Sequence, residues 1–426
     1  MRELIAVTGV GAVCALGRGA AALERGLREG RRAIGPVTLF DTTAYRAHLA
    51  AEVAGLQDEA APADRPGPAW TRPTRADRLG LWAAAEALAG AGLAQGERDG
   101  AGLAPSAERF ALCFGGGNAG VDRAERYLAA MRGGGERAAR LSWLEGLNAS
   151  TTADAVAARH GLRGPRVTIM TACSSSANAL SRGADLLRLG RADAVLAGGA
   201  DALCALVYGG FNALRALDPA PCRPFDRRRA GLTLGEGAAF LVLEPLSRAR
   251  ARGAGVLALL LGAGNTMDAH HLTAPAPDGR GAARAIRAAL ADAARAVGEA
   301  DAAALDTRVG YVNAHGTGTP HNDPAEAAAL HAVFGARAAE LPVSSSKSQL
   351  GHCLSAAGAL EAAVTVLALG AGFLPATVGL EEADPACLLG HVRAPRAAQV
   401  DLALSCSFAF GGSNTALCFG RAAAFA

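Results

Sequence analysis

The 426-residue sequence has little charge and no excess of either sign. Charged residues make up 19% of it, and 42 basic against 39 acidic residues give a formal net charge of +3. Nucleic acids and anionic membrane surfaces require a dominant basic field, so this balance argues against both kinds of partner. The 51% hydrophobic content instead indicates a well-buried soluble chain that builds its core without disulfides or metals.

The nine cysteines contain no C-x-x-C pair. Their odd number, in a chain too long for a disulfide framework, favours reduced thiols in a cytoplasmic protein. We expect no metal site, and one thiol is free to be reactive.

Long uninterrupted apolar runs are also lacking. Residues 4–17 imitate a signal-peptide core, but Glu3 lies in the flank and three glycines break the stretch, so we expect a buried strand and turn. Residues 362–380 are uncharged over the length of a membrane helix, but are interrupted at Gly370, Gly372, Pro375 and Gly379. This segment divides into a buried helix and a strand, and no membrane span is expected.

Lysine is almost absent. Lys347 is the single lysine, and the remaining 41 of the 42 basic residues are arginines in a sequence dominated by Ala, Gly and Arg. A position that keeps lysine against this bias is one that requires a primary amine, although chance survival is the alternative.

Short apolar runs alternate with helical stretches rich in Ala, Leu and Arg along the whole chain. The predicted strands are 4–8, 110–114, 166–170, 194–198, 238–243, 310–313, 342–344 and 402–407. The predicted helices are 21–29, 78–91, 178–189, 282–297, 324–334 and 358–369. The pattern is typical of an α/β protein whose central strands are buried on both faces.

A charged, Gly-containing step at 248–255 predicts a division into halves 1–250 and 251–426. The aperiodic segment 57–73, rich in Pro, Asp and Ala, is expected to be a surface excursion. There is no tandem repeat, but a strand followed by a small-residue helix occurs at 167–180 and again at 341–360. Reactive side chains lie at both junctions.

At the first junction, Cys173 lies between a buried strand and a helix built from Ser and Ala. Unsatisfied N–H groups and the helix macrodipole favour the thiolate there, which would make Cys173 a nucleophile at neutral pH. The alternative is a buried structural cysteine, and we assign that role to the other eight.

His315 ends a predicted strand and is followed by Gly-Thr-Gly-Thr-Pro. The glycines allow a ligand close to the backbone, and the hydroxyls of Thr317 and Thr319 line its approach. A structural histidine is the alternative. His321, beyond the loop, is expected to be exposed.

At the second junction, His352 begins another helix of small residues. Lys347 lies five positions earlier, close enough to tune the same site, and Glu361 lies nine positions later, where it could anchor that network. With Cys173 and His315 these residues form a Cys-His-His set.

Such a set has a specific chemistry. A thiolate can hold an acyl group as a thioester, while two neutral imidazoles stabilise the carbonyl oxygen that gains charge as a neighbouring carboxylate leaves as CO2. A cysteine protease would need one histidine and an orienting Asn or Asp, and a second histidine would be superfluous.

The strings T-A-C-S-S-S, N-A-H-G-T-G-T-P-x-N-D and S-S-K-S-x-x-G-H-x-x-x-A-A-G-x-x-E occur in this order. The sequence thereby resembles the β-ketoacyl-acyl-carrier-protein synthases, most closely synthase II. Further matching strings lie at 7–11, 40–45, 223–231, 235–238 and 407–414, so the likeness spans nearly the whole chain.

The resemblance implies a thiolase-type fold, in which two similar α/β halves stack as five layers, αβαβα. The implied reaction is decarboxylative condensation of an acyl thioester with malonyl-acyl carrier protein, in fatty-acid or polyketide and polyene-type lipid biosynthesis. The implied partners are the acyl carrier protein and a second subunit, usually in a homodimer. No cofactor is expected, because phosphopantetheine arrives on the carrier.

The resemblance also implies residue roles. Cys173 takes the acyl chain, His315 and His352 serve decarboxylation and condensation, and Lys347 supports the His352 side. The remaining implied residues are the backbone N–H groups of Cys173 and Phe410 as oxyanion hole, Phe408 at the entrance, and Thr317 and Thr319 on the phosphopantetheine arm.

Three positions depart from the family pattern. Ala409 replaces a usual Gly, Ser413 a common Thr, and Asn118 an apolar wall of the acyl pocket, which leaves substrate length open.

An arginine cluster at Arg72, Arg75 and Arg78 is a candidate docking surface for the acidic carrier, with a solvated face as the alternative.

Two other functions stay open. A thiolase would use a second cysteine, and Cys353 is adjacent to His352 but is expected to point elsewhere. A chain-length partner subunit would be non-catalytic and normally lacks the nucleophile. Pairing of this chain with such a subunit in a heterodimer is compatible with Cys173.

Overall fold

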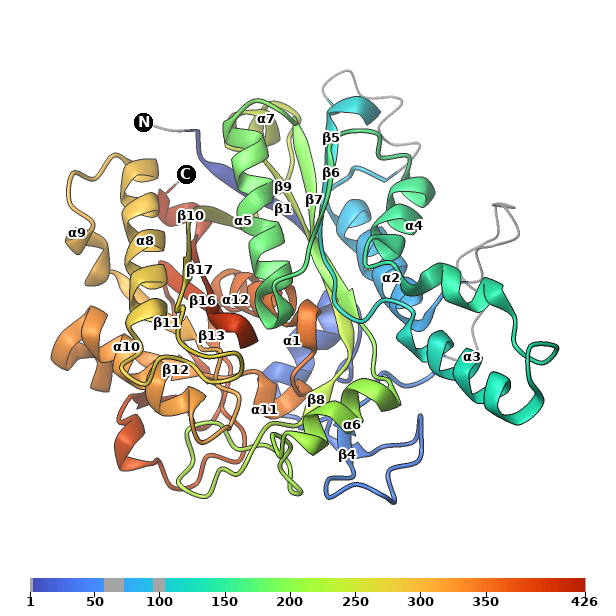
Figure 1. Ribbon diagram of the computed structural model, residues 1–426. Helices are drawn as coiled ribbons and strands as arrows, with labels where there is room; N and C mark the ends of the chain where they lie inside the picture. Colours follow the sequence, from blue (N-terminus) through green and yellow to red (C-terminus); the bar gives the residue numbers. More distant parts are fainter. Residues whose placement is uncertain (1–2, 57–72, 95–103, 426) are drawn as a thin grey trace.

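The computed structural model describes residues 3–56, 73–94 and 104–425 (Figure 1). The surface excursion expected at 57–73 falls almost entirely on residues 57–72, and Arg72 with it, outside the described residues. Every strand and helix expected from the sequence is present, with ends shifted by a few residues.

Ten strands of the described chain build two half-sheets of equal topology. The first half-sheet has the order β6-β5-β7-β9-β1 and the second β12-β11-β16-β17-β10, with β14 added outside β12. In both half-sheets, the first three strands pair in parallel, and each of the last two strands pairs antiparallel with the strand before it. The strands are β1 (Ile5–Cys14), β5 (Phe110–Gly115), β6 (Arg166–Ile169), β7 (Ala194–Asp201), β9 (Gly237–Pro245), β10 (Ala258–Met267), β11 (Val309–Asn313), β12 (Pro342–Ser344), β14 (Gly390–His391), β16 (Leu402–Phe408) and β17 (Ser413–Gly420).

A short antiparallel ladder between residues 5–7 of β1 and 258–260 of β10 joins the half-sheets into one mixed sheet. Smaller pairings involve β2 (Gly17–Arg18), β3 (Gly35–Pro36), β4 (Leu49–Ala51), β8 (Leu234–Gly235), β13 (Phe373–Leu374) and β15 (Arg396–Ala397).

Helices cover both half-sheets and separate them (Figure 1). The outer layers are α2 (Arg75–Gly90) with α4 (Thr151–His160), and α8 (Arg280–Val297) with α10 (Asn322–Phe334). The central layer is α5 (Ser175–Arg188) with α12 (Ala357–Ala371), which pack on each other and on both half-sheets. This is the expected five-layer αβαβα arrangement.

Small residues let the central helices approach closely. A Cβ on Gly358 of α12 would lie 2.7 Å from Ala177 Cβ of α5, and one on Gly115 of β5 would lie 2.2 Å from Ser176 N. Neither position has room for a larger residue, so glycine sets how deep α5 lies between the half-sheets.

The two apolar segments that imitate membrane sequences are core elements. Residues 4–17 contain β1, which is buried throughout and turns back into β2. The window 354–371, around α12, is long and apolar enough to cross a membrane, but 83% of it is buried inside the protein. The helix ends at Gly372 (φ 65°) before β13, as the glycines predicted.

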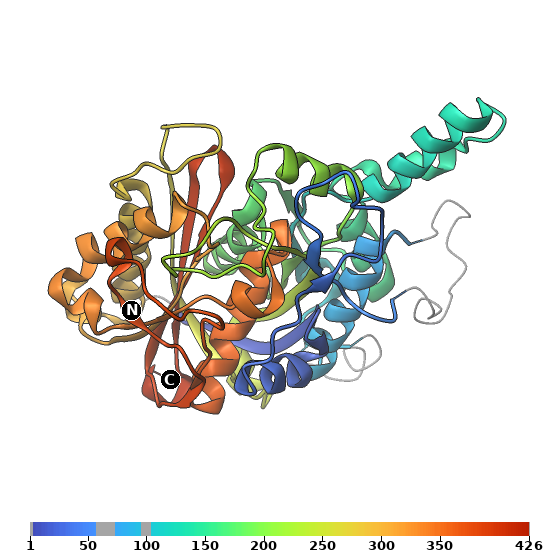
Figure 2. The same ribbon diagram turned by 90° about the horizontal axis from the view of Figure 1, so that it is seen from below.

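The remaining helices connect or decorate the layers. They are α1 (Ala20–Arg28), α3 (Val121–Gly134), α6 (Ala205–Ala213), α7 (Leu246–Ala251), α9 (Ala303–Asp306), α11 (Lys347–Leu350) and α13 (Ala422–Phe425). Figure 2 shows α3 projecting from the body of the molecule. No residue of α3 is buried, which explains why no apolar periodicity predicted it.

Candidate active site

Cys173 lies in a tight turn between the first half-sheet and the central helix layer. The turn is the 3-10 helix η3 (Ala172–Ser174), between β6 and α5. Ala172 has a left-handed backbone (φ 50°), a strained conformation for a residue with a Cβ. The turn presents the Cys173 thiol to a cavity, where it is 7% exposed.

The expectation that helix α5 lowers the pKa of Cys173 is wrong for the free enzyme. Cys173 precedes the first residue of α5 by two positions and is buried. Burial raises the pKa of the thiol to about 11, although Lys347 and a hydrogen bond from the Phe410 amide lower it in part. Loss of solvation outweighs these two effects, so the resting group is a thiol.

His315 ends β11 and begins a loop whose backbone is held by two carboxylates. The N–H groups of His315 and Gly316 donate to Glu326 at 2.7 Å each, and those of Thr317 and Gly318 donate to Asp323 at 3.1 Å each. The sequence motif ends at Asp323, and Glu326 follows three positions later, but sequence reasoning gave neither carboxylate a role. Their three-residue spacing at the start of α10 is the feature that could have revealed them.

His352 lies on the turn before η5 (Leu354–Ala356). Its N–H donates to Thr233 O at 2.7 Å, and its C=O accepts from Gly235 N at 2.9 Å. The His315 and His352 rings meet edge to face with centroids 5.5 Å apart. His352 Nδ1 is buried with no hydrogen-bond partner among the described residues.

Lys347 is completely buried and hydrogen-bonds to His315, whereas the support it was expected to give His352 is electrostatic only. Its Nζ lies 3.1 Å from His315 Nδ1, donates to His315 O at 2.6 Å, and forms an ion pair with Glu361. The expected Lys347–Glu361 pair is thus confirmed. The other Glu361 oxygen accepts from Ser407 Oγ at 3.2 Å.

Burial and the Lys347 charge keep both imidazoles neutral. Desolvation, followed by repulsion from Lys347, lowers the pKa of His315 and of His352 well below the ordinary value. An ammonium has donors only, so His315 Nδ1 accepts from Lys347, and the ring proton of neutral His315 is on Nε2.

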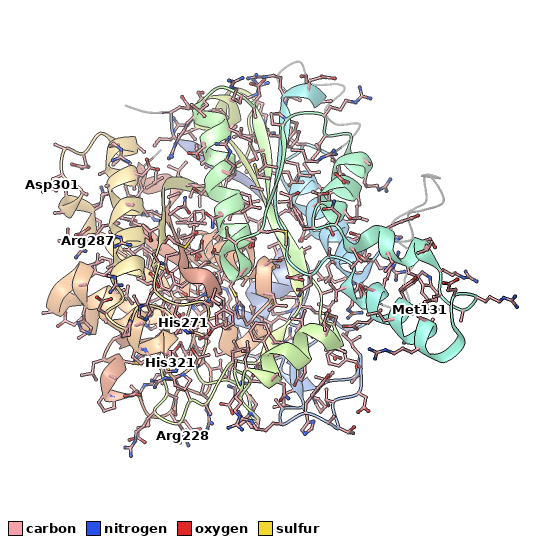
Figure 3. All side chains as sticks on the ribbon, viewed as in Figure 1. Met131, Arg228, His271, Arg287, Asp301 and His321 are labelled. Atoms are coloured by element: carbon pink, nitrogen blue, oxygen red, sulfur yellow. The ribbon has the colours of Figure 1, made fainter. Side chains whose placement is uncertain are left out.

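One cavity of about 380 Å³ brings the predicted groups together. Cys173, His315 and His352 line it, with Thr317, Thr319, Phe408 and Phe410 around them. Arg215 and two exposed imidazoles, those of His271 and His321, also line this cavity, and Figure 3 labels both histidines. His321 is exposed as expected.

Asn118 is not among the described residues that line this cavity. Its N–H donates to Asp201 at 3.3 Å, and its side-chain nitrogen is buried with no partner among the described residues. Asp201, which sequence reasoning missed, is itself buried and also accepts from Ser355 Oγ at 2.7 Å. The assignment of Asn118 to the wall of the acyl pocket stays a prediction, and the structure shows its segment tied to Asp201.

The two departures near Phe410 fit the local geometry. Ala409 is extended (φ −128°), a conformation that does not require glycine. Ser413 Oγ lies 3.0 Å from Ser174 Oγ, which links the Cys173 turn to the loop that carries Phe410.

Of the arginine cluster, Arg72 lies outside the described residues, and Arg75 and Arg78 both make contacts within the chain. Arg75 is 12% exposed and pairs with the buried Glu236, and Arg78 donates to Leu56 O at 3.1 Å. These contacts hold the start of α2 in place, so neither guanidinium is a free docking group.

The nine cysteines are free and buried. Cys353 contacts Glu236 O at 3.4 Å and is not among the residues lining the cavity. The described site therefore has one cavity thiol, two neutral imidazoles and a backbone donor beside the sulfur. This arrangement can form a thioester and stabilise negative charge on a carbonyl oxygen.

Comparison with known families covers both halves of the chain. The family model "Beta-ketoacyl synthase, N-terminal domain" matches residues 2–249, and "Beta-ketoacyl synthase, C-terminal domain" matches residues 257–381.

Individual relatives are similar over nearly their whole lengths. Nodulation protein E of Rhizobium meliloti is 39% identical over 98% of this chain and 99% of its own. The 3-oxoacyl-[acyl-carrier-protein] synthase 2 of Synechocystis is 36% identical over 98% of both. The solved structure described as the ishigamide ketosynthase/chain length factor is 34% identical, has a TM-score of 0.87, and is matched over 99% of this chain and 100% of its own.

Proposed function

The chain belongs to the beta-ketoacyl synthase family, and we propose that Cys173 holds the acyl chain in its reaction. The enzyme condenses an acyl thioester with malonyl-acyl carrier protein, releases CO2 and yields β-ketoacyl-acyl carrier protein. The observation that carries the proposal is the single cavity lined by Cys173, His315 and His352.

In the first step, the Cys173 sulfur attacks the acyl carbonyl and the thiol of the donor carrier leaves. Because the pKa of the resting thiol is high, Cys173 loses its proton only as it attacks, and that proton ends on the leaving sulfur. The N–H groups of Phe410 and Cys173 stabilise the oxyanion of the tetrahedral intermediate.

In the second step, the malonyl group loses CO2 and its thioester oxygen gains negative charge. His315 donates to that oxygen through Nε2–H, because Lys347 occupies Nδ1, and His352 donates from the perpendicular ring. The resulting carbanion attacks the carbonyl carbon of the Cys173 thioester, a carbon–carbon bond forms, and the Cys173 sulfur leaves as a thiolate that takes a proton from solvent.

The carrier delivers each substrate on its phosphopantetheine arm, so the enzyme needs no cofactor of its own. Thr317 and Thr319, whose hydroxyls lie 2.9 Å apart on the cavity wall, bind the amides of this arm. Phe408, with its ring centroid 5.8 Å from that of His315, borders the entrance.

A second subunit pairs along β6. This strand contacts only β5 among the described strands, and Met170 after it is 62% exposed. The free edge suits a second copy of this chain, and a chain-length subunit of the same fold would fit it equally.

The free thiols support a cytoplasmic location, and we place the boundary between the halves at residues 250 and 251.

Intact mass spectrometry of the enzyme after incubation with a panel of acyl carriers tests the function. Wild-type enzyme should gain one acyl group on Cys173, and Cys173→Ala should gain none. The variant should still release CO2 from malonyl carrier, because both histidines remain. Acylation or full condensation activity in Cys173→Ala would refute the assignment.

A further inference from the structure

The loop that carries Thr317 and Thr319 depends on a buried carboxylate. Asp323 is 0% exposed, and its Oδ1 accepts the N–H groups of Thr317 and Gly318 at 3.1 Å each. Its Oδ2 accepts Phe225 N at 2.7 Å. The three N–H donors favour the ionised form of this carboxylate, whereas its burial works against ionisation.

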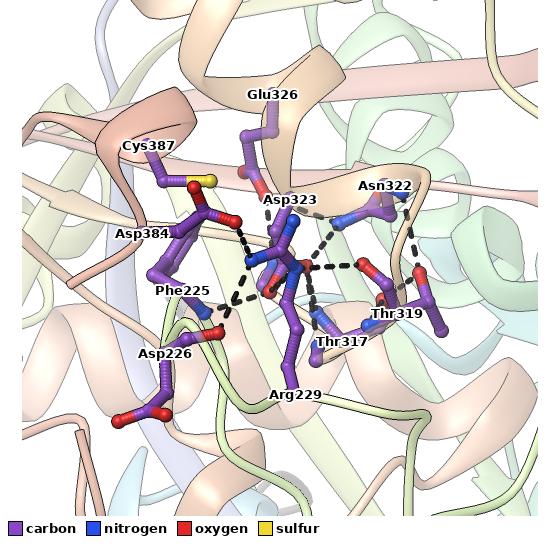
Figure 4. A network of polar contacts seen from close by, with 12 residues as sticks. Phe225, Asp226, Arg229, Thr317, Thr319, Asn322, Asp323, Glu326, Asp384 and Cys387 are labelled. Carbon is purple, nitrogen blue, oxygen red and sulfur yellow. Dashed lines mark hydrogen bonds and ion pairs between the residues drawn. The ribbon is translucent and has the colours of Figure 1, made fainter. Parts of the chain in front are cut away.

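The cation that faces Asp323 is Arg229. Its Nε lies 3.9 Å from Asp323 Oδ2, and its side chain is only 7% exposed. Figure 4 shows the guanidinium at the centre of this network, between the Thr317–Thr319 loop and Asp384.

Arg229 also holds the far end of the loop directly. Its Nε donates to Thr319 O at 3.2 Å, while Nη1 donates to Asp226 O at 3.1 Å and pairs with Asp384. The planar fork thus makes contact with the loop backbone, its own turn and a carboxylate on a third segment.

Thr319 is held on its other side as well. Its Oγ1 accepts Asn322 N at 3.2 Å and lies 2.9 Å from Thr317 Oγ1. The hydroxyl pair therefore moves with the backbone that Arg229 and Asp323 fix. A shift at Thr319 O would displace the groups that face the cavity, without contact between Arg229 and substrate.

We propose that Arg229 is a positioning residue that aligns the Thr317–Thr319 loop for the phosphopantetheine arm, through its bond to Thr319 O and its charge beside Asp323. The proposal rests on the assignment of that loop to the arm in the proposed function. Substrates that carry the phosphopantetheine arm therefore need Arg229, whereas the transfer of the acyl group to Cys173 does not.

Arg229→Lys tests the proposal, because an ammonium keeps the charge and loses the fork. Cys173 acylation is measured by intact mass with acyl carrier, an acyl pantetheine thioester and an acyl ethanethiol thioester, which has no amide. Loss of one charge-assisted hydrogen bond predicts about tenfold slower acylation from the first two donors. The rate with the ethanethiol thioester should not change.

Arg228→Lys is the matched control. Arg228 is the neighbouring residue, is 48% exposed, and pairs with Asp226 and Glu381 rather than with the loop. This variant should match wild type with all three donors.

Asp384→Asn gives a second measurement if Arg229→Lys does not fold. Asp384 is 22% exposed at the outer end of the network, and its loss should slow only the two pantetheine donors, by about threefold. Equal slowing of all three donors, or of none, in the folded variants would overturn the proposal. Failure of wild-type enzyme to accept acyl carrier would instead refute the proposed function.

Discussion

Lys347 shows why one residue can resist the arginine bias of a whole sequence. Its three N–H donors meet three acceptors, namely His315 Nδ1, His315 O and Glu361, in a space with 1% exposure. A guanidinium has five donors in a plane and a longer reach, so it cannot satisfy this three-way arrangement without displacing the imidazole.

We expect Lys347→Arg to lose condensation activity by a factor on the order of 10² or more, as when one preorganised electrostatic group is removed. Steady-state condensation kinetics and the unfolding temperature measure the effect. Near-native kinetics in the folded variant would show that charge alone suffices and that the lysine survived by chance.

The buried Cys173 thiol leads to a pH prediction. Because its pKa is raised to about 11, the thiol form dominates at neutral pH and the thiolate fraction grows about tenfold per pH unit. Alkylation of Cys173 by iodoacetamide should therefore keep rising from pH 7 to pH 10. Quantitative peptide mapping of the alkylated cysteine measures this rate. A plateau below pH 8 would mean that the helix dipole prevails after all.

At the scale of elements, the Gly358 contact holds the central helices together. A methyl group there would lie 2.7 Å from Ala177 Cβ and 2.8 Å from Ala177 N, so Gly358→Ala must push α5 and α12 apart. We expect a loss of about 1–3 kcal/mol in the free energy of unfolding, typical of overpacking, and slower acylation of Cys173.

Gly370 provides the control in the same helix. The nearest atom to its added Cβ is Leu257 O at 3.8 Å, an ordinary contact. Gly370→Ala should lose neither stability nor activity. Urea unfolding measures the free energy of unfolding of both variants. Equal values for Gly358→Ala and Gly370→Ala would contradict the packing argument.

The sequence predicted most of the buried elements, because an apolar run indicates burial directly. The strand expected at 342–344 matches β12, and the helix expected at 282–297 matches α8, which begins two residues earlier. It did not predict α3, whose side chains are all at least partly exposed, and it missed the strands β10 and β17, although both are largely buried.

The sequence predicted which residues form the site, but not which of them contact each other. The Cys-His-His set converges in one cavity as expected, yet Lys347 lies against His315 instead of His352. Sequence separation suggested His352 as the hydrogen-bond partner of Lys347, but the parallel pairing of β11 with β12 brings His315 beside the Lys347 turn. Contacts that depend on tertiary packing, such as that of Arg229 with Asp323, leave no local pattern.

At the scale of the whole molecule, the free edge of β6 is the feature that invites a partner. β6 runs parallel to β5, with Phe114 opposite Thr168. The carbonyl groups of Pro165 and Ile169 accept from Leu112 and Gly116 of the β5 segment. Since alternate residues of a strand face opposite neighbours, the backbone N–H of Thr168 points away from β5.

Thr168→Pro removes that outward N–H and leaves the ladder with β5 intact, because proline is tolerated on an edge strand. If two subunits pair through β6, this variant should sediment as a monomer at concentrations where wild type is a dimer. Thr168→Val, which keeps the N–H, should remain a dimer. Circular dichroism confirms that both variants are folded. If the Thr168→Pro enzyme is still a dimer, the subunit interface does not lie at the β6 edge. The unpaired strand of the large sheet is then not completed by a second chain.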